Sequence, residues 1–118
     1  MIELSRVYIA VMVLLLISDH TAANLGVVSE NVRIESESLG YVLQYRVYTP
    51  PGYDTFSNLP TIYITDGQWY LSAGHMDTVL DEEIARGTID PVVAIFLDNR
   101  NPDNLQENRR NKPIFLCY

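Results

Sequence analysis

The hydrophobic and polar positions divide the chain into one long apolar run near its start and several shorter apolar segments later. The long run covers residues 7–17, contains no charged side chain and follows Arg6. It is too short for a comfortable membrane span, whereas the small residues Thr21 and Ala23 behind it are typical of a signal-peptidase site. We therefore expect residues 1–23 to be a signal peptide, or else an uncleaved N-terminal anchor. A cleaved signal implies an exported protein, periplasmic or secreted, without stable membrane association.

Two strands are predicted in the next part of the chain. Residues 27–38 alternate between apolar and polar positions, and Gly40 provides a turn. Residues 41–49 are rich in aromatic and β-branched side chains, so the two segments together predict an antiparallel hairpin. The apolar residues that we expect near one face of the first strand are Val28, Val32 and Ile34.

A loop and a third strand follow the hairpin. Residues 50–60 are dense in proline, glycine, aspartate, serine and asparagine, which predicts a loop with a rigid start at Pro50 and Pro51. Pro60 opens the third strand. Its residues 62–64 are Ile, Tyr and Ile in succession rather than alternating, so we expect both faces of this strand to be covered.

A helix between two apolar strands is predicted in the second half of the chain. Amphipathic spacing places Met76, Val79, Leu80 and Ile84 on one helical stripe, and Gly87 supplies a left-handed stop. Residues 91–98 form another apolar run, which ends in an acid. A strand, a helix and a strand in this order predict a right-handed βαβ unit. The fold class is therefore α/β, with the first hairpin at the edge of the sheet.

Charge and composition exclude several classes of function. The 118 residues carry a formal net charge of −7, and the cations cluster late, at Arg109, Arg110 and Lys112. Without a basic stripe, a nucleic-acid partner is not expected. The single cysteine, Cys117, forms no internal disulfide and has no metal-site spacing.

Neither a metal nor a cofactor is expected. The acidic residues 81–83 are typical of a solvated helix face, and the sequence contains no phosphate-binding loop. A calcium loop beginning at Asp98 fails, because its sixth position is Asp103 instead of glycine and its twelfth is Arg109 instead of glutamate.

Polar residues follow both apolar strands of the βαβ unit. Ligand sites in such sheets lie beyond the carboxyl ends of the strands, where Asp66 and Asp98 are placed. We expect the two carboxylates to project towards the same rim. An aspartic hydrolase would require them to share a proton at close range, and an Asp-Gly pair such as Asp66-Gly67 is more typical of an ordinary turn.

The sequence resembles a known family in this region. The segment YRVYTPPGYDTFSNLPTIYITDGQWYL and the later LDEEIARGTIDPVVAIFLDNR resemble the N-terminal part of the esterase-D or enterochelin-esterase-like serine esterases, which are α/β-hydrolases. The family typically shows a Tyr-x-Pro-Pro-Gly-Tyr segment, a strand ending in Asp-Gly and a strand ending in an Asp-Asn-like pair. Their counterparts are residues 48–53, Asp66-Gly67-Gln68 and Asp98-Asn99. The resemblance covers about residues 41–110 and implies a small-molecule carboxylic ester as substrate.

The resemblance also implies a set of site residues. In α/β-hydrolases one backbone N–H of the oxyanion hole comes from the loop after the third strand, here residues 66–72. Gly67 would let the backbone approach closely, and the N–H of Gln68 would point at the developing negative oxygen. Trp69 and Tyr70 would line the acyl or alcohol pocket. The other candidates for substrate binding are Asp66, Asp98 and Asn99.

The catalytic triad of the family is not found in the sequence. No Gly-x-Ser-x-Gly turn occurs: Ser72 is followed by Ala73 and Gly74, but Tyr70 stands where the first glycine is needed. In the family the histidine follows the acid in the chain, whereas His75 comes before the acids of the later strands. His75 suits a cap or surface role. We therefore expect residues 24–118 to be a partial α/β-hydrolase domain, truncated and inactive alone, with an open sheet edge that could allow self-association.

A second hypothesis does not require catalysis. Trp69, Tyr70 and Tyr53 could form an aromatic platform for a ligand, in a non-catalytic binding module or an inert remnant of the esterase fold. A stable, monomeric fold of the chain would favour this alternative.

Overall fold

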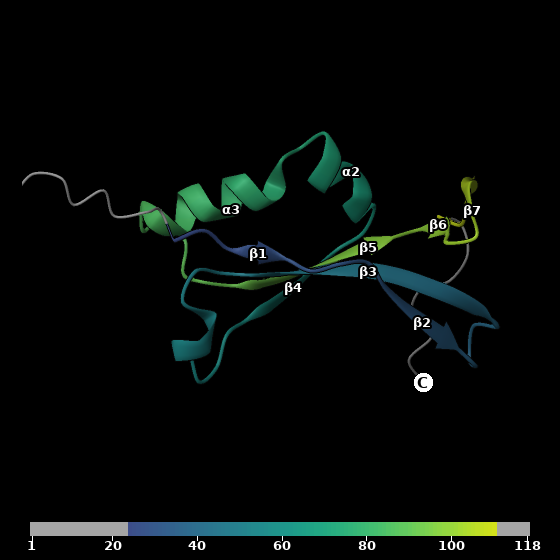
Figure 1. Cartoon of the computed structure of the whole chain (residues 1–118), viewed down its shortest axis with the longest axis horizontal. Helices are drawn as coiled ribbons and strands as arrows, with labels where there is room; N and C mark the ends of the chain where they lie inside the picture. Colours follow the sequence, from purple (N-terminus) through teal and green to yellow (C-terminus); the bar gives the residue numbers. More distant parts are fainter. Residues whose placement is uncertain (1–23, 111–118) are drawn as a thin grey trace, which may run out of the picture.

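The computed structural model describes residues 24–110. The predicted signal peptide, Lys112 and Cys117 lie outside the described residues. The described chain forms one main sheet with two helices over one of its faces (Figure 1). The strands of this sheet are β1 (Val27–Val28), β2 (Val32–Ser36), β3 (Tyr41–Thr49), β4 (Thr61–Ile64) and β5 (Val93–Asp98). The remaining elements are the 3₁₀-helix η1 (Tyr53–Thr55), the helices α2 (Gly67–Ser72) and α3 (Met76–Ala85), and the hairpin strands β6 (Arg100–Asn101) and β7 (Asn104–Asn108).

The strand order of the main sheet is β1-β3-β5-β4, and β2 also pairs with β3. β3 pairs antiparallel with β1, β2 and β5, whereas β5 pairs in parallel with β4. The parallel pair is joined by α2 and α3, so the predicted βαβ connection is present. The α/β fold class and the hairpin at the sheet edge are both confirmed.

The first predicted strand is divided by a bulge into β1 and β2. Val28 pairs with Tyr48, whereas Val32 pairs with Tyr45, so four steps along one strand match three steps along β3. A shift of one residue turns all following side chains to the other face of the sheet. Val32 and Ile34 therefore lie opposite to Val28, and the prediction that the three share one face was wrong.

The core lies between the sheet and α3. Its buried members are Tyr48, Leu80, Ala94 and Phe96, and partly buried apolar residues pack around them. Those surrounding residues are Val28, Ile64, Leu71, Met76, Ile84 and Val92. The predicted helical stripe is thus confirmed at three of its positions, whereas Val79 is 44% exposed and does not belong to it. Gly87 has the predicted left-handed conformation, with φ of 71°.

Neither α-helix lies over the opposite face of the sheet, and of the described helices only the short 3₁₀-helix η1 lies on that side (Figure 1). Tyr63 on β4 is 63% exposed, and Ile62 is 37% exposed. The prediction that both faces of this strand are covered was therefore wrong, because the lack of alternation says nothing about which elements pack on each face. β4 pairs only with β5 among the described strands. Self-association through its other edge stays a prediction.

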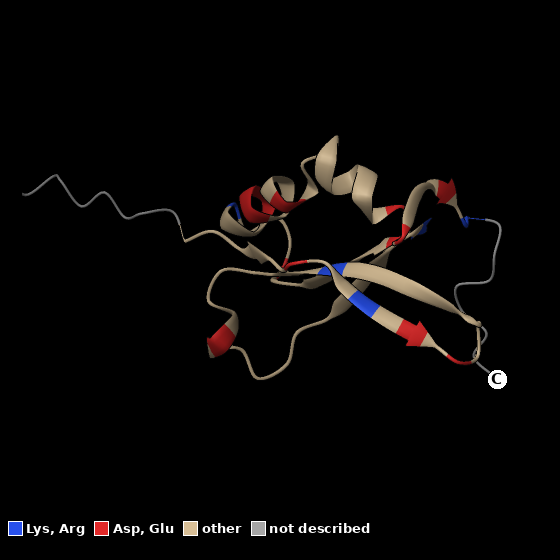
Figure 2. Ribbon diagram, turned by 45° about the vertical axis from the view of Figure 1, so that its right-hand side comes forward, with Lys and Arg blue, Asp and Glu red and all other residues tan. Residues whose placement is uncertain are grey.

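Acidic side chains are distributed over α3, η1 and the two hairpins (Figure 2). Glu82 and Glu83 form ion pairs with Arg86 on the exposed side of α3, as expected for a solvated helix face. Asp81 is different, because it accepts hydrogen bonds from within the fold. No group of three or more potential metal ligands occurs among the described residues.

Asp81 links three segments of the chain. The hydroxyl of the fully buried Tyr48 donates to Oδ1 of Asp81 at 2.8 Å, and the backbone N–H of Gly26 donates to the same oxygen at 2.8 Å. One carboxylate on α3 therefore holds β3 and the segment before β1. Burial, followed by the hydrogen bond and charge of Asp81, raises the pKa of Tyr48 well above its ordinary value.

We expect Tyr48→Phe to lower the free energy of unfolding by about 1–2 kcal/mol at pH 7, because a hydrogen bond to a carboxylate is lost. This difference should shrink above about pH 10. Above this pH, Tyr48 is ionised in the unfolded wild type but not in the folded wild type. Rising pH therefore lowers the free energy of unfolding of the wild type through this group, and Tyr48→Phe lacks the group. Urea denaturation of both proteins between pH 7 and pH 11 measures the effect.

Tyr63→Phe is the matched control, since the Tyr63 side chain is largely exposed and the same hydroxyl is removed. It should unfold like the wild type at every pH. If the difference in free energy of unfolding between Tyr48→Phe and the wild type stays constant up to pH 11, the role assigned to burial is contradicted.

Candidate functional site

The carboxyl ends of β4 and β5 carry a polar cluster centred on Asp66. Asn99, directly after β5 and nearly buried, donates from Nδ2 to Oδ1 of Asp66 at 2.9 Å. Arg110 donates from Nε to the same oxygen at 3.2 Å, and its terminal nitrogen lies 2.9 Å from Oδ2. We call these three residues the rim cluster. Two of them, Asp66 and Asn99, are candidates from the sequence, and the structure brings them into contact.

Asp66 also has an unusual backbone conformation. Its φ of 56° and ψ of 30° lie in the left-handed region, which costs a non-glycine residue about 1–2 kcal/mol but suits aspartate and asparagine best. Asp66 is the N-cap residue of α2, yet its side chain makes no cap hydrogen bond. The carboxylate is instead held by the rim cluster, and its backbone carbonyl accepts from the N–H of Trp69 at 2.9 Å.

Gly67 brings the start of α2 directly onto β5. A Cβ atom at this position would lie 2.5 Å from the Cβ of Phe96 and 2.6 Å from the backbone carbons of the same residue. No side chain fits there, so only glycine permits this approach. The sequence had suggested a close approach of this backbone to a ligand, whereas the contact in the structure is with β5.

The segment after Asp66 is a helix, and the expectation of a loop over residues 66–72 was wrong. α2 comprises Gly67 to Ser72, and the N–H groups at its start have no acceptor within the helix. Gly67 is buried, whereas Gln68 is partly exposed, so the N–H of Gln68 is the more accessible of the first two. The backbone of this first turn is fixed on two sides, by Phe96 below Gly67 and by the hydrogen bonds of Asp66.

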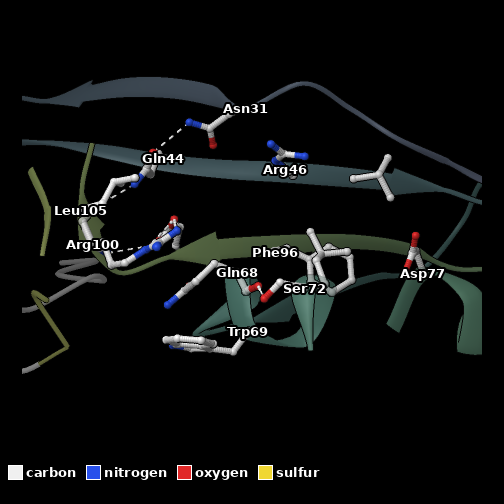
Figure 3. Close-up of a pocket in the computed structure, with 13 residues that line it drawn as sticks. Asn31, Gln44, Arg46, Gln68, Trp69, Ser72, Asp77, Phe96, Arg100 and Leu105 are labelled. Carbon is white, nitrogen blue, oxygen red and sulfur yellow. Dashed lines mark hydrogen bonds and ion pairs between the residues drawn. The ribbon is translucent and has the colours of Figure 1, made fainter. Parts of the chain in front are cut away.

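A cavity of about 560 Å³ lies beside α2, on the helix-covered face of the sheet (Figure 3). β3 and β5 form its floor, and α2, the start of α3 and the β6–β7 hairpin contribute to its walls. Of the candidates from the sequence, it is lined by Gln68, Trp69 and Asp98. Tyr70 is about half exposed and does not line it.

The proposed aromatic platform is not formed as a unit. Trp69 and Tyr70 belong to α2, whereas Tyr53 belongs to η1, and Figure 1 shows these two elements on opposite sides of the sheet. A ligand on this chain would therefore meet Trp69 without Tyr53.

Asp98 is paired with its own arginine inside the cavity. Arg100 donates from Nε to Oδ1 of Asp98 at 2.9 Å and from its terminal nitrogen to Oδ2 at 2.6 Å. This hydrogen bonding raises the pKa of Arg100. The side-chain amide of Gln68 makes two hydrogen bonds when its nitrogen faces Asp98 and its oxygen faces Trp69. The nitrogen then donates to Oδ1 of Asp98 at 3.3 Å, and the oxygen accepts from the indole N–H of Trp69 at 3.2 Å.

Asp66 and Asp98 therefore do not form a pair of acids that share a proton. Each carboxylate is neutralised by a different arginine, Arg110 and Arg100 respectively. An aspartic hydrolase, already disfavoured by the sequence, receives no support from this geometry.

The β6–β7 hairpin was missed in the sequence. It delivers Arg100 to the cavity and leads to Arg110 at the rim, and its end is fixed by the N–H of Arg109, which donates to the carbonyl of Asn99 at 2.8 Å. The turn residues 101–104, Asn-Pro-Asp-Asn, were an available signal for this hairpin. Its strands carry polar residues at nearly every position, so no hydrophobic alternation accompanied that signal.

The residues that could imitate a nucleophile and a base are not arranged as such. Ser72 donates from Oγ to the carbonyl of Gln68 at 2.7 Å, within its own helix. His75 is exposed, occupies the N-cap position of α3 and makes no side-chain cap hydrogen bond. Within residues 24–110 no hydrogen bond connects Ser72 with His75.

The fold is that of an esterase-type α/β domain. The chain belongs to the family described as "Putative esterase", whose model matches residues 36–114. A solved structure of a ferulic acid esterase has the same fold, with a TM-score of 0.56 and 16% sequence identity. The match covers 65% of this chain and 31% of that one, so the chain spans about a third of that protein's length. None of the curated proteins compared with this sequence matches it significantly.

We expect Gly67→Ala to lower the free energy of unfolding by about 1–3 kcal/mol, because the added methyl group forces α2 away from β5. Ser72→Ala, at the exposed end of the same helix, should stay within about 0.5 kcal/mol of the wild type. Urea denaturation measures both variants. Equal stability of Gly67→Ala and the wild type would show that α2 can move away from β5 without cost.

Proposed function

We propose that this chain forms the oxyanion-binding part of a serine ester hydrolase that acts on small-molecule carboxylic esters. The observation that carries the proposal is the fixed start of α2. Asp66 is held in a left-handed conformation by Asn99 and Arg110, and Gly67 is pressed onto Phe96. Membership of the esterase family supports the reaction class, and the name of the solved relative supports a carboxylic ester as substrate.

This arrangement suits the stabilisation of a developing anion. Attack on an ester creates a negative charge on the carbonyl oxygen, and N–H donors that are already in place stabilise it without reorganising. The N–H of Gln68 lies in the first turn of α2, where the peptide dipoles also favour negative charge. Arg110 neutralises the neighbouring Asp66, so the rim cluster does not repel an anion.

The nucleophile, its acid and its histidine are proposed to come from outside the 118 residues. The sequence contains no Gly-x-Ser-x-Gly turn, and Ser72 and His75 are engaged or exposed at other places of the fold. The chain as given would therefore bind a tetrahedral anion but would not turn over an ester.

We expect a stable, non-aromatic tetrahedral anion, methyl methylphosphonate, to shift the backbone amide resonances of Gly67 and Gln68 in a ¹H–¹⁵N NMR titration. Gln68→Pro should abolish the shifts near this position, because proline is tolerated in the first turn of a helix but has no N–H. Gln68→Ala is the matched control: it removes the same side chain, keeps the N–H and should respond like the wild type.

Equal binding by Gln68→Pro and Gln68→Ala would refute the role of this amide. The same preparation should not hydrolyse a p-nitrophenyl ester above the buffer rate. Turnover that a serine-directed phosphonate abolishes would contradict the proposal that the nucleophile lies outside these residues.

A non-catalytic ligand-binding module is the second candidate function. The cavity beside α2 favours it, because a volume of about 560 Å³ is within the range of small-molecule sites and its walls combine apolar and polar side chains. The two functions are compatible, since none of the three rim-cluster residues lines the cavity.

We propose further that the protein is exported. The support is the apolar run of residues 7–17 and the small residues up to Ala23 in the sequence. No helix in the described part of the chain is long and apolar enough to span a membrane. Expression of the full chain in a bacterium, followed by mass spectrometry of the periplasmic protein, should show a new N-terminus at Asn24. An intact Met1 on a membrane-bound protein would indicate an anchor instead.

A further inference from the structure

Arg46 differs from the other arginines of residues 24–110 because it forms no ion pair. The others each form an ion pair with a carboxylate, and they are Arg33, Arg86, Arg100, Arg109 and Arg110. Arg46 makes neither a hydrogen bond nor an ion pair with any described residue. It projects from β3 into the cavity beside α2, where Figure 3 shows it without an interaction partner. Arg46 is an exposed residue at this cavity, so its guanidinium donors face solvent and are accessible to an anion.

Part of the cavity wall around Arg46 is apolar. Phe96 is its direct neighbour across the sheet in the β3–β5 register and is almost completely buried. Val28 and Leu71 line the cavity beside it, and the indole of Trp69 lies on the opposite wall. An aromatic ring can therefore lie on these side chains while a charged group reaches Arg46.

The other charges limit the charge of the ligand. Asp98 is neutralised by Arg100, but Asp77 lines the same cavity and has no partner among the described residues. A single carboxylate matches one free guanidinium with two parallel hydrogen bonds, whereas a dianion would be repelled by Asp77 about twice as strongly as a monoanion.

We propose that this cavity binds a small aromatic monocarboxylate, with the carboxylate on Arg46 and the ring against Phe96 and Leu71. This site depends on the side chain of Arg46, whereas the proposed function depends on the backbone N–H of Gln68, and ligand binding requires no catalysis. Its failure and the failure of the proposed esterase function are therefore distinguishable.

Trp69 provides the measurement, because it is the single tryptophan of the chain and lines the cavity. We expect 3-phenylpropionate to change the tryptophan emission of the wild type in a saturable manner at pH 7. The neutral isostere 3-phenylpropanamide should bind about tenfold more weakly, as expected for the loss of a charge-assisted hydrogen bond.

Arg46→Gln should weaken the binding of 3-phenylpropionate about tenfold and abolish the preference over the amide. Arg86→Gln is the matched control, because it removes the same charge from the far end of α3 and should leave both affinities unchanged. Asp77→Asn should strengthen the binding of the acid a few-fold, because it removes the opposing charge. Circular dichroism of each variant verifies the fold.

Three results would overturn the proposal. They are the absence of saturable binding by the wild type, equal affinity for the acid and the amide, and an affinity of Arg46→Gln that equals that of Arg86→Gln. If Arg46→Gln does not fold, the comparison of acid with amide and the effect of Asp77→Asn still decide the matter.

Discussion

The contact between Gly67 and Phe96 is the constraint on which the rest of this structure depends. Phe96 belongs to β5, which lies between β3 and β4 in the main sheet, and its side chain is part of the core. A backbone that rests directly on this strand cannot shift without disturbing the core. The start of α2 is therefore held directly against the sheet, at the carboxyl ends of the strands, where ligand sites lie in such folds.

Charge neutralisation at the rim and in the cavity has a common origin. Arg100 and Arg110 both come from the segment after β5, and each meets an aspartate at the carboxyl end of a parallel strand. Two carboxylates near a site for anions would otherwise repel the substrate. The chain carries a net charge of −7, so these local ion pairs, rather than the overall charge, make an anionic ligand acceptable here.

α2 connects the two proposed sites. Its first turn presents backbone N–H groups at the rim, and the side chains of Gln68 and Trp69 line the cavity. In the proposed function the backbone N–H of Gln68 binds the developing oxyanion, whereas its side chain lines the cavity.

Strong local patterns in the sequence determined β3, the helix α3 with its glycine stop, the strand β5 and the two acids at the strand ends. Tertiary structure decided the features that depend on a neighbour. A bulge between β1 and β2 reversed the face of Val32, because register is set by pairing with β3. The pairing of Asp66 with Arg110, 44 residues later, and the free Arg46 follow from the distance between segments in space, which no local periodicity encodes. Propensity and alternation describe one segment and its solvent, whereas a site is made by side chains that only the packed chain brings together.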